Sequence, residues 1–162
     1  CYPFYELCAV HDLPVLFHVG PAFHPWLYSR FCHPLEFDQV AADFPNVTMI
    51  MGHAGHEWWA DCLALARGHL NMVLDLSGWQ LKLRDRPEEA LHAIDRMRNF
   101  VGIDRLLWGN DFPGPRDRIS LRQCREVFVN LPFLAAKHGY SFSDADVQAI
   151  LGANAQSLLK LP

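Results

Sequence analysis

Histidine and aspartate residues stand at matching places along the sequence, each at or just beyond the end of a short apolar run. His18 lies near the end of the first run, His53 follows the second, and Asp111 follows the fourth. Imidazole and carboxylate groups that share one pocket are ligands for zinc, manganese or ferrous iron, and no thiolate is needed. These three residues therefore predict a metal site, provided that the fold brings them together.

The apolar runs that must position these residues predict four β-strands. Each run is nearly continuous in apolar residues, which is typical of strands buried on both faces of a sheet. The runs cover residues 15–19, 47–51, 72–76 and 105–108.

Helical spacing of apolar residues predicts helices between the strands and after the last one. Pro132 is expected to kink or divide the longest of them, and Ser143 with Asp146 has the spacing of a capping box. The predicted helices cover residues 34–44, 57–70, 87–101 and 121–138, with shorter ones from 143 and after 154.

The alternation of strands and helices predicts an α/β fold in which parallel strands are joined by right-handed helical crossovers. Such strands present all their carboxyl ends on one face, so His18, His53 and Asp111 should converge there. A four-stranded doubly wound sheet and half of a (β/α)8 barrel both fit the pattern. No G-x-G-x-x-G motif follows a strand, which disfavours a nucleotide-binding sheet.

Composition excludes several classes of protein. The chain has 162 residues, 51% of them hydrophobic, and a formal net charge of −4. This is typical of one globular domain, with no apolar stretch that could span a membrane and no basic surface for a nucleic acid. The five cysteines form no C-x-x-C motif, so we expect free thiols in a reducing, cytoplasmic compartment and no cysteine zinc site.

Other polar residues near the strand ends allow two interpretations each. Asp75 could join the site or hold a loop by accepting backbone hydrogen bonds. His56 could face the pocket or lie at a helix start that faces water. The segment that contains Trp26 and Arg30 could bind a planar carboxylate by stacking and charge pairing, or simply pack on the rim of the fold.

Five motifs in order resemble the amidohydrolase-related metal-dependent hydrolases of the aminocarboxymuconate-semialdehyde decarboxylase type. The resemblance covers nearly the whole chain. The motifs lie at residues 14–20, 44–55, 71–78, 104–113 and 150–155.

The resemblance implies a (β/α)8 TIM barrel of which residues 1–162 are the C-terminal part, with strands five to eight. It implies that His18 is a metal ligand, that His53 faces the reacting water or the substrate, and that Asp111 both binds the metal and transfers a proton. The family usually has serine at the position of Asn110. Its strand-one His-x-His pair has no counterpart in these residues, so we expect that part of the site lies outside this sequence.

Two functions follow as expectations. The first is an enzyme with one divalent metal ion, zinc before manganese or iron, that hydrolyses or decarboxylates a small cyclic or aromatic acid. It would act on a small molecule, without nucleic acid or membrane partners, and could form a homo-oligomer. The second is a non-catalytic half-barrel that binds or assembles with another chain through open strand edges near Val15 and Leu106.

Overall fold

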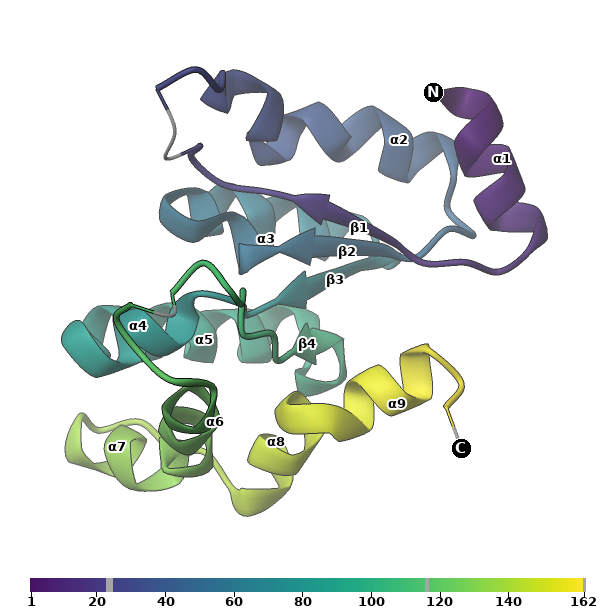
Figure 1. Ribbon diagram of the computed structural model, residues 1–162. Coiled ribbons are helices and arrows are strands. Elements are labelled where there is room, and N and C mark those ends of the chain that lie inside the picture. Colours follow the sequence, from purple (N-terminus) through teal and green to yellow (C-terminus); the bar gives the residue numbers. More distant parts are fainter. Residues whose placement is uncertain (23–24, 116, 162) are drawn as a thin grey trace. The chain divides into compact units, whose positions relative to one another are not determined.

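The computed structural model describes residues 1–22, 25–115 and 117–161 of the chain (Figure 1). The chain divides into two compact units, Cys1–Asp75 and Leu76–Pro162, here called unit 1 and unit 2. No helix within the described ranges is long and apolar enough to cross a membrane.

The described residues of unit 1 form a parallel sheet with helices before and between its strands. The strands are β1 (Val15–His18), β2 (Met49–Gly52) and β3 (Met72–Asp75). The helices are α1 (Tyr2–Val10), η1 (Ser29–Cys32), η2 (Pro34–Phe37), α2 (Asp38–Asp43), η3 (His53–Trp58) and α3 (Trp59–Gly68). The predicted helix over residues 34–44 is therefore a 3₁₀ turn that continues into α2.

The three strands of unit 1 are paired in parallel, as the sequence predicts. Val15 lies opposite Met49, and Met49 lies opposite Met72. Every residue of β2 and β3 is buried, which confirms the expectation of strands covered on both faces.

Strand β1 departs from that expectation, because its side chains alternate between half-buried and exposed. Leu16 is 65% exposed. In the described part of unit 1, β1 is hydrogen-bonded to β2 alone, so it is an edge strand and one of its faces is uncovered. Parallel strands buried on both faces need neighbours and helices on every side, which this strand lacks.

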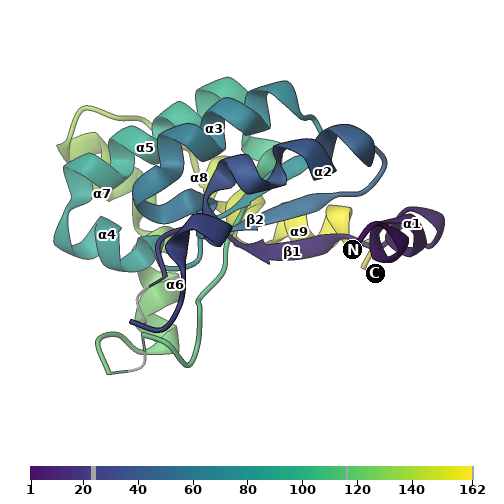
Figure 2. The same cartoon turned by 90° about the horizontal axis from the view of Figure 1, so that it is seen from above.

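Helices α2 and α3 cover one face of the sheet in unit 1 (Figure 2). Helix α3 contributes the buried side chains of Cys62, Leu63 and Ala66. Phe17 of β1 packs against Phe37 of η2, with ring centroids 4.9 Å apart. Burial of these apolar side chains is the main force that holds the helices against the strands.

The described residues of unit 2 are mostly helical and include one short strand. The strand is β4 (Leu106–Leu107). The helices are α4 (Trp79–Asp85), α5 (Pro87–Val101), η4 (Ile103–Arg105), α6 (Leu121–Val129), α7 (Leu131–Lys137), α8 (Asp144–Gln148), η5 (Ala149–Ala153) and α9 (Asn154–Leu158). Helix α4 follows Ser77 and Gly78 and was not among the predicted helices.

Two signals in the sequence of unit 2 are confirmed. The predicted helix over residues 121–138 divides at Asn130, and Pro132 occupies the first turn of α7, where its missing N–H costs nothing. Ser143 and Asp146 form a reciprocal capping box at the start of α8. Both features arise from local backbone chemistry, which explains why they could be predicted without tertiary information.

Asparagine 154 fixes the position of β4 within unit 2. Its side-chain Nδ2 donates hydrogen bonds to the carbonyl oxygens of Ile103 at 2.7 Å and Leu106 at 2.8 Å. The N–H of Trp108 donates to the carbonyl of Ile150 at 2.9 Å. The C-terminal motif at residues 150–155 therefore holds the strand that leads to Asp111.

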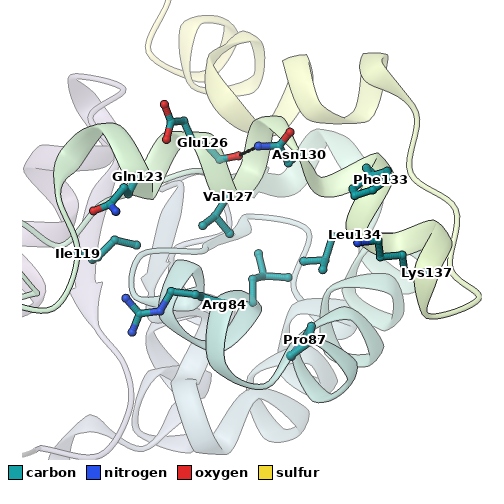
Figure 3. A pocket seen from close by; sticks show the side chains of 11 residues that line it. Arg84, Pro87, Ile119, Gln123, Glu126, Val127, Asn130, Phe133, Leu134 and Lys137 are labelled. Atoms are coloured by element: carbon teal, nitrogen blue, oxygen red, sulfur yellow. Dashed lines mark hydrogen bonds between the residues drawn. The ribbon is translucent and has the colours of Figure 1, made fainter.

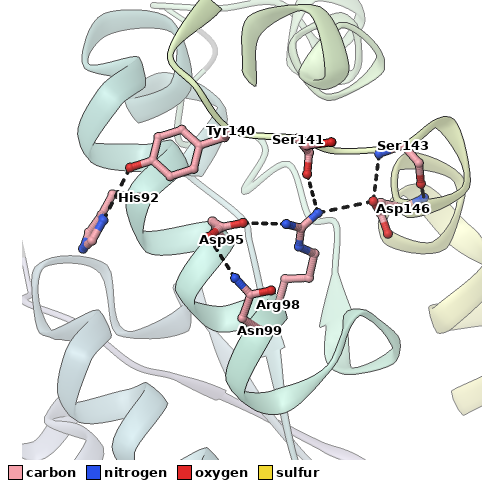
Figure 4. A network of polar contacts seen from close by, with 8 residues as sticks. All are labelled: His92, Asp95, Arg98, Asn99, Tyr140, Ser141, Ser143 and Asp146. Atoms are coloured by element: carbon pink, nitrogen blue, oxygen red, sulfur yellow. Dashed lines mark hydrogen bonds and ion pairs between the residues drawn. The ribbon is translucent and has the colours of Figure 1, made fainter. Parts of the chain in front are cut away.

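A polar network centred on Arg98 joins α5 to α8 (Figure 4). The guanidinium donates to Asp95 at 2.5 Å, to the carbonyl of Ser141 at 2.6 Å and to Asp146 at 3.4 Å. Burial acts to raise the pKa of Asp146, but hydrogen bonds from Ser143 and the charge of Arg98 outweigh it and lower the pKa. A carboxylate whose pKa is lowered by folding stabilises the folded state at any pH above its pKa in the unfolded chain. This stabilisation is lost as the pH falls through its pKa in the folded state.

We therefore expect Arg98→Met to lower the free energy of unfolding by about 2–3 kcal/mol at pH 7, because several charge-assisted hydrogen bonds are lost. The difference from wild type should narrow as the pH falls from the ordinary range of an unfolded aspartate, ~4, through the lowered pKa of folded Asp146. Urea denaturation across this pH range measures both effects. The matched control is Arg122→Met, which breaks the exposed Arg122–Glu126 pair and should cost under ~0.5 kcal/mol. Equal losses in the two variants would contradict the prediction.

Candidate active site

The carboxyl ends of β1 and β2 bring two of the predicted site residues together. His18 is the last residue of β1, and His53 directly follows β2. Because the strands are parallel and in register, Nε2 of His53 lies 3.1 Å from Nδ1 of His18, and the ring centroids are 4.9 Å apart. The sequence interpretation that these histidines share one sheet edge is thus confirmed within unit 1.

The turn after β2 has an unusual backbone that aims its histidines. Positive φ angles occur at His53 (62°), Ala54 (45°), Gly55 (81°) and His56 (50°). Left-handed backbone costs a residue with a Cβ about 1–2 kcal/mol, and several such residues in succession are a feature of functional sites. The sequence predicts a strand over residues 47–51 and a helix over 57–70 but no backbone conformation between them, so the left-handed turn is a finding of the structure.

Packing against α3 holds the strained turn in place. A Cβ added to Gly55 would lie 2.9 Å from Cβ of Cys62, so only glycine fits at this position. Burial, with a smaller effect of Asp61, raises the pKa of the Cys62 thiol to about 12. The thiol is therefore neutral near pH 7 and serves to pack the turn, in agreement with the absence of a cysteine metal motif in the sequence.

His56 and Asp75 both belong to the surroundings of His53. The His56 ring stacks on the His53 ring with centroids 4.6 Å apart and planes 15° from parallel. The backbone N–H of His53 donates to Oδ2 of Asp75 at 3.4 Å. Asp75 thus holds the loop that begins at His53, which is one of the two roles predicted for it. His56 is half-buried and lies against His53.

The donor chemistry of the pair fits a divalent metal ion in part. Two nitrogens at about 2.0–2.1 Å from one zinc ion lie roughly 3.0–3.4 Å apart, and the observed separation of 3.1 Å falls in that range. Catalytic zinc usually has three protein ligands. Within the described residues, no group of three or more His, Cys, Asp and Glu side chains is placed to hold an ion. Within unit 1, His18 and His53 therefore place two nitrogen atoms close together, one fewer than the three protein ligands that catalytic zinc usually has.

Asp111 lies in unit 2, in an exposed loop that follows β4. Its φ angle of 57° is also left-handed, and its carbonyl accepts a hydrogen bond from the N–H of Gly114 at 2.8 Å. A Cβ added to Gly114 would lie 2.9 Å from the Asp111 carbonyl oxygen and 3.1 Å from its Oδ2. The loop is thus built closely around the Asp111 carboxylate.

Asn110 has a clear structural role in this loop. Its Oδ1 accepts a hydrogen bond from the N–H of Phe112 at 2.8 Å, the pattern of an Asx turn. A serine hydroxyl makes the same turn more weakly. The asparagine at this position is therefore compatible with the loop geometry that the family resemblance requires, and it leaves Asp111 in place.

The aromatic segment after β1 places a cation among exposed rings. The Arg30 guanidinium lies 4.5 Å from the ring centroid of Phe31 and 5.7 Å from that of Tyr28. Trp26 is 73% exposed. The N–H of Gly20, two residues after His18, donates to the carbonyl of Cys32 at 2.9 Å and ties this segment to the end of β1. Phe23 and His24, at the start of the segment, lie outside the described residues.

A pocket of about 380 Å³ lies in unit 2, between α4, α6 and α7 (Figure 3). Val127 and Leu134 are directed into it, whereas the carboxylate of Glu126 points away. None of the predicted site residues lines this pocket. The pocket therefore contains no part of the predicted site.

Comparison with solved structures shows the same fold in larger proteins. The chain is similar to an uncharacterized TIM-barrel protein from Bordetella bronchiseptica, with 25% identity, a TM-score of 0.75, and coverage of 98% of this chain and 50% of the other. An amidohydrolase from Burkholderia multivorans with bound zinc gives 20% identity and a TM-score of 0.65, covering 98% and 56%. The chain is also similar to a 2,6-dihydroxybenzoate decarboxylase bound to 2,6-dihydroxybenzoate, with 18% identity and a TM-score of 0.61. The match covers 98% of this chain and 54% of the decarboxylase.

The parallel strands and the helices between them define an α/β fold with a parallel sheet, and a TIM-barrel protein is among its structural neighbours. The amidohydrolase family profile matches residues 2–161, and the chain therefore belongs to the amidohydrolase family. No curated protein matches the chain. The chain spans about half the length of the solved structures that it resembles.

Proposed function

We propose that this chain forms part of a metal-dependent hydrolase or non-oxidative decarboxylase that acts on a small cyclic or aromatic carboxylic acid. The observation that carries the proposal is the His18–His53 pair, 3.1 Å apart at the carboxyl ends of two parallel strands in an amidohydrolase-family chain. In barrel enzymes this end of the strands carries the site.

His18 and Asp111 are the proposed metal ligands. A bound divalent ion, most simply zinc, polarises a carbonyl or carboxylate and makes water more acidic. In a hydrolysis, Asp111 accepts a proton from the attacking water and His53 delivers one to the leaving oxygen or nitrogen. In a decarboxylation, one of these two groups delivers the proton to the carbon atom that loses carbon dioxide.

Arg30 and Trp26 are the proposed substrate-binding residues. Arg30 can pair with a substrate carboxylate, because its fork of N–H donors matches the two carboxylate oxygens. Trp26, with its large exposed ring, can stack on a planar substrate. The decarboxylase among the structural neighbours binds 2,6-dihydroxybenzoate, a planar carboxylate of the class proposed here.

The proposed place of this chain is the C-terminal half of the barrel, with strands five to eight, in an enzyme of the aminocarboxymuconate-semialdehyde decarboxylase type. The order of the five motifs supports this placement, as does the match to about half of each solved structure. The free cysteines support a cytoplasmic location.

Removal of metal tests the proposal. The protein expressed from its complete reading frame should lose activity toward hydroxybenzoates or small lactones after dialysis against a chelator, because substrate polarisation requires the ion. Addition of zinc, manganese or ferrous iron should restore it. Release of carbon dioxide distinguishes decarboxylation from hydrolysis.

Activity that persists in protein shown to be metal-free by elemental analysis would contradict the proposal. Protein that binds no divalent metal and turns over none of these acids or lactones would instead favour the non-catalytic assembly module. Magnesium serves as a control ion, because it prefers oxygen ligands to imidazole and should restore activity poorly.

A further inference from the structure

We infer that Gln80 is a positioning residue that holds the Asp111 loop through the backbone of Asn110. The inference rests on the proposed role of Asp111 as a metal ligand. It assigns a function to α4, a helix that contributes none of the predicted site residues.

Gln80 is a polar side chain placed where burial is costly. It lies in the first turn of α4 and is 0% exposed. Its Nε2 donates a hydrogen bond of 2.9 Å to the carbonyl oxygen of Asn110. Its Oε1 is buried and has no hydrogen-bond partner among the described residues. Because a buried amide oxygen without a partner lowers stability, an apolar side chain would suit stability better at this position.

The hydrogen bond from Gln80 acts on the residue that precedes Asp111. Two local bonds already shape the loop, from Phe112 N–H to the Asn110 side chain and from Gly114 N–H to the Asp111 carbonyl. Both bonds join residues within the loop, so they set its curvature but do not fix its position in the unit. The bond from Gln80 connects the loop to a helix of the unit and therefore fixes where the loop lies.

The left-handed backbone of Asp111 explains why such an anchor is needed. A non-glycine residue with φ of 57° returns to an extended or right-handed conformation unless surrounding contacts prevent it. Either change would turn its carboxylate away. Gln80 also reaches Cys124 of α6, where burial raises the thiol pKa and a hydrogen bond with Gln80 opposes the rise. The amide is thus fixed between α6 and the loop.

The test measures metal affinity rather than catalytic rate. In the protein expressed from its complete reading frame, Gln80→Met should weaken zinc binding by about 10- to 100-fold, the usual effect of losing a group that orients a ligand. Competition with a chromophoric chelator measures the dissociation constant. The matched control, Gln148→Met, changes an exposed glutamine of α8 and should leave the affinity within about twofold.

A double-mutant cycle separates positioning from general destabilisation. If Gln80 acts through Asp111, Gln80→Met should change the affinity by less than about threefold when Asp111→Ala is already present. The inference would be overturned if Gln80→Met weakened zinc binding by the same factor with and without Asp111→Ala. It would also be overturned if Gln80→Met left the zinc affinity of the otherwise wild-type protein unchanged. An unchanged affinity in Asp111→Ala alone would remove the proposed role of Asp111, and with it this inference.

Hydrogen exchange in the wild-type protein provides a second measurement that needs no variant. Zinc binding should slow amide exchange in residues 109–114 and, through Gln80, in the first turn of α4 at residues 79–82. Slower exchange in the loop with no change in α4 would overturn the inference even if Gln80→Met does not fold.

Discussion

The variants His18→Ala and Asp111→Ala are expected to lose most of their bound metal and on the order of 10³–10⁴-fold in kcat/KM. A metal ion contributes several kcal/mol to stabilisation of the transition state, and each 1.4 kcal/mol is a factor of ten in rate. Both side chains are exposed in their own units, so their removal should leave the fold intact. Elemental analysis, steady-state kinetics and far-UV circular dichroism measure the three quantities.

The two controls match each variant in residue type. His11→Ala removes an exposed histidine at the end of α1, and Asp144→Ala removes an exposed aspartate in the first turn of α8. Both should keep full metal content and wild-type rates. Stoichiometric metal in His18→Ala and Asp111→Ala would show that the ligands lie elsewhere, even if the activity of those variants were low.

The sequence predicted the strands and the edge at which the candidate residues lie, because both depend on local patterns. Continuous apolar runs are characteristic of buried parallel strands, and β2 and β3 are buried throughout. Parallel pairing then places His18 and His53 at a common edge without any knowledge of side-chain conformation. The capping box at Ser143 was equally local.

The shape of the turn at residues 53–56 could not be predicted in the same way. Left-handed φ angles at His53, Ala54 and His56 are unfavourable for each residue taken alone. They persist because the turn packs against α3, with Gly55 in contact with Cys62. This contact joins the turn to a later helix, and only the tertiary structure reveals it. The glycines at positions 52 and 55 were the only visible hint.

The exposed face of β1 and the burial of Gln80 could not be predicted from the sequence either, because both depend on tertiary neighbours. The run at residues 15–19 is as apolar as the others, and edge position depends on which strands are neighbours rather than on composition. A lone glutamine in a helix reads as a surface residue. Its burial becomes evident only when α6 and the loop after β4 are seen around α4.

The variant His53→Asn is expected to lower kcat by about 10²–10⁴-fold while metal content stays close to that of wild type. General acid or base groups usually contribute this much to a rate, and asparagine cannot transfer a proton. Asparagine is comparable to histidine in polarity and can still donate a hydrogen bond toward His18, which lies 3.1 Å from the imidazole in the wild-type protein. The orientation of His18 should therefore largely survive.

Parallel measurements of kcat and bound metal decide between three roles for His53. If kcat falls and the metal is retained, the role of His53 is proton transfer or substrate polarisation. Loss of metal together with activity would make His53 a ligand, a role that the 3.1 Å spacing to His18 also permits. An unchanged rate would leave the ring with a structural role, namely stacking on His56. The control His11→Asn should match wild type in both measurements, because His11 is exposed after α1 and precedes the amino end of β1, whereas the candidate site lies at the carboxyl ends of the strands.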